Sequence, residues 1–198
     1  LIFAGNLSVS DKFSVDFFHH LNKPIEKDDI LSATDKVYIR FTPNSSWAFK
    51  FGKIPLAVGS WEFDSAPIDV YFYSDYIEAY KAYQPGFSGQ YNFRNGKDAI
   101  ELQATKSPLA DQGRHDMFAF HLMWKGNHEP FHFIWSANME KYDLANRFTV
   151  CLGNKVTLHR FTAYLDLVGG RTEQRIYGDP VVIVRTMNGG KGILYDKI

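Results

Sequence analysis

The sequence has little of three things that would point directly to a function. Its single cysteine is Cys151, which excludes an intrachain disulfide and a metal site built from several cysteines. Lysine plus arginine and aspartate plus glutamate both number 22, so the net charge is zero. This balance argues against binding nucleic acid through a basic face. No run of about 18 apolar residues occurs, so no transmembrane helix is predicted, although a membrane β-barrel would escape this test.

Catalytic and metal-binding motifs are also missing. Cys151 lies in an alternating run, which is typical of a buried small residue rather than a nucleophile. His121 and His132 share a face of one predicted hairpin but have no fixed carboxylate beside them. The neighbours His19 and His20 point to opposite faces of a strand. We therefore predict no enzyme activity, no metal and no cofactor.

What the sequence has in excess is aromatic residues, and they follow a period of two. Phenylalanine, tyrosine and tryptophan make up 16% of the chain. The segment Phe13-Ser14-Val15-Asp16-Phe17 shows the pattern, which indicates a strand with one apolar face. It recurs at residues 37–41, 47–51, 87–94, 100–104, 118–124, 131–137, 148–152 and 161–167. We predict an all-β chain of about ten antiparallel strands.

Turn sequences between these runs predict hairpins. Asn95-Gly96 is a strong two-residue hairpin signal, and closing the hairpin there places Tyr91 opposite Ile100 and Gln90 opposite Glu101. The other predicted turns are at residues 10–12, 43–46, 126–129 and 153–155. The turn at 43–46 places Ile39 opposite Phe49, and the turn at 126–129 places Trp124 opposite Phe131. A bulge is predicted near His159. Longer polar connections are predicted at residues 22–34, 54–84, 107–115 and 139–146.

Two architectures fit this pattern. A soluble barrel or sandwich that binds a carbohydrate or lipid would bury the aromatic face. A membrane barrel would turn that face toward lipid and enclose the polar face. The sequence favours the membrane barrel, because short turns alternate with long loops and aromatic residues gather near the turns. The aromatic residues that would form the girdle include Trp47, Trp124, Phe131 and Trp135.

The long loop carries a more specific signal. Between Gly52 and Phe93 the chain resembles the outer-membrane porins related to phosphate-selective porins, in the version found in Bacteroidetes-type bacteria. The matching residues are Gly59, Glu62, Pro67, Ile68, Tyr71, Tyr73, Ser74 and Asp75. The run from Thr162 to Asp166 is similar to another strand of that family, and the similarity extends over roughly residues 36–170.

The resemblance implies a barrel of roughly 16 strands, often a trimer, in which the loop at residues 54–84 folds inward and narrows the pore. The chain ends at Ile198 without the terminal aromatic strand of such barrels, so we expect a fragment that forms a single barrel domain. The basic ladder that gives phosphate selectivity has no counterpart here.

We therefore predict an outer-membrane porin that lets small polar or ionic solutes diffuse through a water-filled barrel. Its expected partners are outer-membrane lipid, the solutes and further copies in a homotrimer, with no nucleic acid. Charged lumen residues would tune selectivity. The residues expected to line or constrict the pore are Arg40, Lys50, Glu62, Asp64, Asp69, Asp75, Arg94 and Glu101.

Overall fold

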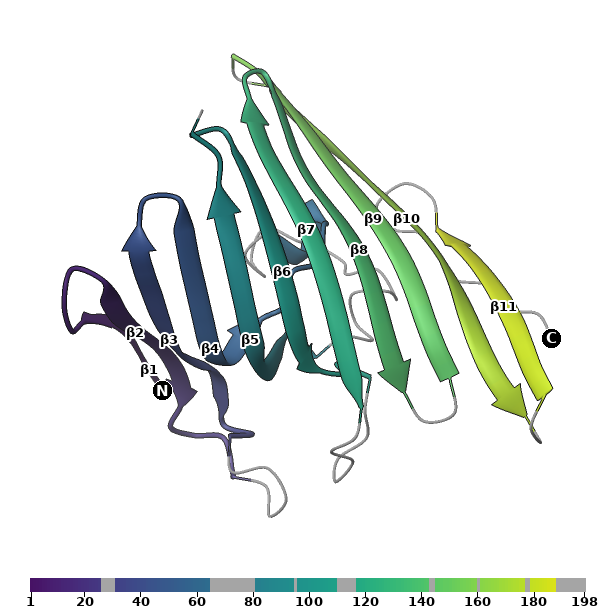
Figure 1. The fold of residues 1–198 in the computed structure, drawn as a ribbon, viewed down its shortest axis with the longest axis horizontal. Coiled ribbons are helices and arrows are strands. Elements are labelled where there is room, and N and C mark those ends of the chain that lie inside the picture. Colours follow the sequence, from purple (N-terminus) through teal and green to yellow (C-terminus); the bar gives the residue numbers. More distant parts are fainter. Residues whose placement is uncertain are drawn as a thin grey trace.

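The computed structural model describes residues 1–25, 31–64, 81–94, 96–109, 117–142, 145–159, 161–176 and 179–187. In these residues eleven strands form one antiparallel sheet, in which each strand pairs with its neighbours in the chain (Figure 1). The strands are β1 (Ile2–Ser8), β2 (Phe13–His20), β3 (Thr34–Asn44), β4 (Trp47–Pro55), β5 (Tyr83–Asn92), β6 (Asp98–Lys106), β7 (Phe118–His128), β8 (Phe131–Tyr142), β9 (Ala145–Leu158), β10 (Phe161–Ile176) and β11 (Asp179–Met187). One short helix, α1 (Trp61–Asp64), follows β4.

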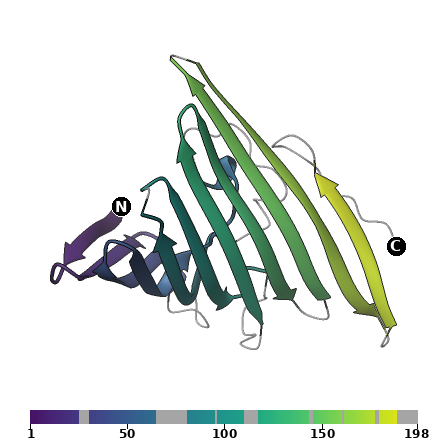
Figure 2. The same ribbon diagram turned by 45° about the horizontal axis from the view of Figure 1, so that its top comes forward.

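This arrangement confirms the predicted all-β, up-and-down architecture, with eleven strands in place of about ten. Within the described residues β1 and β11 form the two edges of the sheet. The sheet twists strongly, so that β1 and β2 run in a different direction from β9 to β11 (Figure 2). No helix among the described residues is both long and apolar enough to cross a membrane.

The connections at one end of the sheet are all short. They lie between β1 and β2, β3 and β4, β5 and β6, β7 and β8, and β9 and β10. At the other end, three connections are long, as predicted, but β8 and β9 are separated only by residues 143–144. The intermediate loop expected at residues 139–146 was therefore wrong, because both strands continue into it.

The predicted registers were right at one hairpin and wrong at two. Tyr91 pairs with Ile100, as the Asn95-Gly96 turn requires, and Gly96 has the positive φ of 66° that such a turn favours. Trp124, however, pairs with Trp135 instead of Phe131. Likewise, Ile39 pairs with Phe51 instead of Phe49.

At β7 and β8 the cause is that β7 continues through Gly126 to His128 and turns only at residues 129–130. At β3 and β4, β3 continues to Asn44, with a register shift between Phe41 and Asn44. The ring of Phe133 fills the space where a side chain of Gly126 would be. The turn predicted at residues 153–155 lies inside β9, and the turn is at residues 159–160, where a bulge had been expected. Both shifted registers move by an even number of residues, so every side chain stays on its predicted face.

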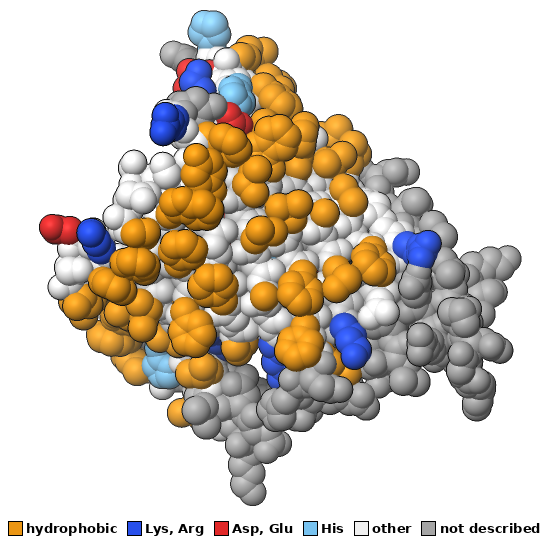
Figure 3. Space-filling model, viewed as in Figure 1, with side chains coloured by type: hydrophobic (Ala, Val, Ile, Leu, Met, Phe, Trp, Pro, Cys, Tyr) orange, Lys and Arg blue, Asp and Glu red, His pale blue; other side chains and the backbone are white. Residues whose placement is uncertain are grey.

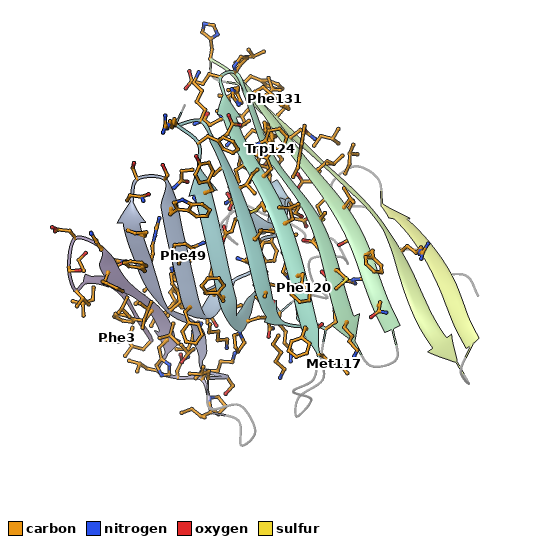
Figure 4. The ribbon with its side chains drawn as sticks, viewed as in Figure 1. Phe3, Phe49, Met117, Phe120, Trp124 and Phe131 are labelled. Atoms are coloured by element: carbon orange, nitrogen blue, oxygen red, sulfur yellow. The ribbon has the colours of Figure 1, made fainter. Side chains whose placement is uncertain are left out.

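Many aromatic residues of the strands lie on an exposed apolar face of the sheet (Figure 3). Figure 4 labels Phe49, Phe120, Trp124 and Phe131 among them. Exposed apolar residues of this face include Ile39, Phe51, Phe87, Leu102, Phe120, Leu122, Trp124, Phe148, Val150, Leu165 and Leu167, which are 39% to 68% exposed. A soluble protein would bury such a surface, whereas a membrane barrel presents it to lipid.

This face carries a transverse row with one residue from each strand between β4 and β10, which begins beside the β3–β4 turn. The row consists of Trp47, Tyr91, Ile100, Trp124, Trp135, Leu152 and Leu167. The rings of Trp47 and Tyr91 are 4.9 Å apart, and those of Trp124 and Trp135 are 5.7 Å apart. The tryptophans of the predicted girdle therefore lie at one level of the sheet, close to the turns.

Candidate pore-lining face

The other face of the sheet is polar, and its side chains also form a transverse row. The row takes one residue from each strand between β2 and β9: Ser14, Arg40, Lys50, Ser88, Gln103, His121, Asn138 and Thr149. Alternation along each strand puts these residues on one side, and the register aligns them. A continuous polar row on the face opposite the apolar surface is the arrangement expected of a water-filled barrel lumen.

One ion pair lies near the middle of this polar face. Lys50 Nζ is 2.9 Å from Glu101 Oε1, and the two side chains are only 15% and 5% exposed. Gln103 Nε2 donates to the same carboxylate oxygen at 3.0 Å. Lys50 and Glu101 therefore largely neutralise each other, and neither offers a free charge to a solute.

A stretch of chain after β4 runs across this polar face. We call residues 56–64 the crossing segment. The backbone N–H of Ala57 donates to Gln103 Oε1 on β6 at 2.9 Å, and that of Gly59 donates to Ser136 Oγ on β8 at 2.8 Å. In Figure 1, α1 lies behind the sheet, on the side away from the apolar face.

The crossing segment ends against β10, where Asp166 receives three hydrogen bonds. The hydroxyl of Ser60 donates to Asp166 Oδ2 at 2.6 Å. The N–H groups of Trp61 and Glu62 donate to Oδ1 at 3.2 Å and to Oδ2 at 3.0 Å. The Trp61 ring also lies under Lys155 of β9, with Nζ 4.8 Å from the ring centroid. Two strands thus hold the start of α1.

The polar face is closed to solvent on β7 to β9. His121, Asn138 and Glu140 are at most 3% exposed, and Cys151 is fully buried as predicted. These side chains bond one another: Asn138 Oδ1 bonds His121 Nδ1 at 3.0 Å, and Arg147 Nε donates to Glu140 Oε2 at 2.8 Å. Polar side chains that reach water would need no such network.

On β2 and β3 the same face is more open. Arg40 is exposed, and no ion pair joins it to any of the described residues. Lys36 and Asp16 form only a long contact of 3.9 Å, with side chains 32% and 17% exposed. Arg40 is therefore a charge on this face that no ion pair with a described residue neutralises.

Comparison with protein families decides the class. The family model described as phosphate-selective porin O and P matches residues 6–158. The chain belongs to this porin family. It is accordingly an outer-membrane β-barrel porin, from a family of channels rather than enzymes. No curated protein and no solved structure matches the chain.

The structure places six of the eight predicted pore residues of this porin. Arg40, Lys50 and Glu101 lie on the polar face as described above. Glu62 and Asp64 lie in α1, and Asp64 lines a cavity of 370 Å³ beside Lys125 and Asn127. Arg94 is exposed in the turn between β5 and β6, while Asp69 and Asp75 lie outside the described residues.

Sequence reasoning missed the residues that hold the crossing segment in the porin. The alternation placed Asp166 and Gln103 on the polar face, but it gave no reason to single them out. The bond from Ser60 to Asp166 spans 106 positions of sequence, so no local pattern could have indicated it. His132 pairs with Asn127, six residues from His121 in β7, and thus the two histidines lie further apart than predicted.

Proposed function

We propose that this porin lets small polar or ionic solutes diffuse passively along the polar face of its sheet. The observation that carries the proposal is the polar row from Ser14 to Thr149, which lies opposite an exposed apolar face. A surface of this kind, enclosed by a barrel, provides water and hydrogen-bonding groups across the membrane. The apolar face contacts outer-membrane lipid.

The loop at residues 54–84 is proposed to narrow the pore. Its described start supports this idea, because residues 56–64 lie against the polar face of β6 to β10 and not outside the sheet. Glu62 and Asp64 would then stand at the constriction, together with Asp69 and Asp75 from the part of the loop that is not described.

Selectivity is proposed to depend on Arg40 more than on Lys50. The charge of Lys50 is paired with Glu101 at 2.9 Å, while Arg40 is exposed and presents several N–H donors. An anion passing β3 gains this interaction without displacing a carboxylate. An assembly of three copies stays a prediction from the family resemblance.

Planar-bilayer recording of the purified full-length protein tests the proposal. We expect extraction only with detergent, followed by stepwise conductance that persists without a voltage threshold, as for an open diffusion pore. A protein that dissolves without detergent and leaves the bilayer silent would contradict the proposed function and favour a soluble binding module.

A further inference from the structure

We propose that Asp166 is a positioning residue: it fastens the crossing segment to the barrel wall and so confines solutes to the β2 and β3 side of the lumen. The inference rests on the proposed porin function and adds to it the side chain that sets the path. Residues 56–64 occupy the polar face of β6 to β10 only if something holds them there, and Asp166 is the acidic side chain that contacts them.

The first argument is the hydrogen bonding of Asp166. Its carboxylate is only 5% exposed, and both oxygens accept bonds from the crossing segment. Bonds to a charged acceptor are stronger than neutral ones, and a buried carboxylate without donors is costly. Detaching the crossing segment would strip Asp166 of all three donors at once, so the attached state is favoured.

The second argument is the closeness of the backbones. A Cβ on Gly59 would lie 2.5 Å from the backbone nitrogen of Ser136, and a Cβ on Gly153 would lie 3.1 Å from the carbonyl oxygen of Gly59. Gly59 therefore has no room for a Cβ where the crossing segment lies directly on β8, and a Cβ on Gly153 of β9 would be crowded. The crossing segment is therefore in close contact with β8 and β9, and Asp166 binds it where this contact ends.

The third argument is the pattern of burial. Ser136, whose hydroxyl accepts the N–H of Gly59, pairs with Cys151 on β9. Cys151 is 0% exposed although its side chain is on the polar face. Its burial beside Ser136 makes the native thiol a reporter of the crossing segment. Water-soluble reagents reach Cys151 only when this part of the lumen opens.

The test compares Asp166→Ala with wild type in reconstituted full-length protein. Cys151 is labelled with a charged maleimide, and single-channel conductance is recorded. We expect Cys151 labelling to accelerate roughly tenfold or more, because the loss of even one bond to a charged group commonly changes an opening equilibrium by that factor, and this variant loses all three bonds to Asp166. Conductance should increase, since solutes gain the β6 to β10 side.

The matched control is Asp16→Asn, which alters a carboxylate of the same face that bonds Asn6 and does not contact the crossing segment. It should leave Cys151 protected. Ser60→Ala, which removes one of the three donors, should produce a smaller acceleration than Asp166→Ala. A general loss of folding would lower conductance in every variant, so an increase distinguishes release of the segment from damage to the barrel.

If wild-type channels conduct and Asp166→Ala changes neither labelling nor conductance, the role of Asp166 is overturned. The proposed porin function would then stay intact. Equal acceleration of labelling in Asp16→Asn would also overturn it, since the effect would then not be specific to Asp166. Silent wild-type protein would contradict the porin function itself, and with it the path inferred here.

Discussion

The polar face of the sheet has two regions that differ in how they treat charge. On β2 and β3, Lys36, Asp16 and Arg40 are partly or largely exposed, and their ion pairing is weak or absent among the described residues. On β7 to β9, Glu140 and Arg147 are buried and paired at 2.8 Å. The same alternation produced both regions, so the difference comes from what lies on top of them.

This difference teaches that a lumen-facing residue need not line the path of a solute. Where the face is buried, polar side chains form an internal network and contribute to stability. Where the face is open, we propose that they contribute to selectivity. Under this proposal, charge has a structural role on one side of the lumen and a functional role on the other.

The largest effect is expected from breaking the buried pair. Arg147→Ala removes the ion pair with Glu140, which is 0% exposed, and loss of one member of a buried pair costs about 3–5 kcal/mol. Lys36→Ala removes a partly exposed contact and should cost at most about 1 kcal/mol. Urea unfolding of both variants in the same lipid measures the contrast, and similar losses would show that the two regions do not differ.

A smaller effect is expected from forcing the crossing segment away from the wall. Gly59→Ala introduces a Cβ that would meet backbone atoms of β8, and overpacking of this kind costs about 1–3 kcal/mol. The control Gly169→Ala adds a methyl group where no atom lies within 4 Å. We expect Cys151 to be labelled faster in Gly59→Ala than in wild type, and at the wild-type rate in Gly169→Ala. Unchanged labelling in Gly59→Ala would contradict the close contact between the crossing segment and β8.

The smallest effect on stability is expected on the open side. Arg40→Gln should change the free energy of unfolding by no more than about 0.5 kcal/mol, since Arg40 is exposed. It should nevertheless reduce the anion preference, measured as the reversal potential in a salt gradient. Arg94→Gln, in the β5–β6 turn, is the matched control and should shift the potential less. An equal shift in both variants would contradict the assigned role of Arg40.

Much of the fold was predictable from local pattern. The alternation at Phe87 to Asn92 identified a strand, and the Asn95-Gly96 turn fixed its pairing with β6 because a two-residue turn leaves one register. Pairing at Gly126 was not predictable in this way. Glycine there resembled the start of a turn, but Gly126 pairs with Phe133 and the ladder continues, with the Phe133 ring in the space where a side chain would be.

The candidate site was predictable only in part. Arg40, Lys50 and Glu101 were placed on the polar face by parity, and that is where they lie. That Glu101 would neutralise Lys50, and that Arg40 would remain exposed, depended on neighbours from strands distant in sequence. Spacing within one strand contains no information about such partners.

The sequence by itself determined the period of the strands, the face of each side chain and the family, because these depend on neighbours along the chain. Only the tertiary structure decided which lumen residues are open. Asp166 accepts a hydrogen bond from Ser60, which is 106 positions away in the sequence. Gly59 and Gly153 permit the backbone of the crossing segment to lie close to β8 and β9. Contacts of this kind arise from the folding of a loop onto a finished sheet, and the alternation that builds the sheet cannot encode them.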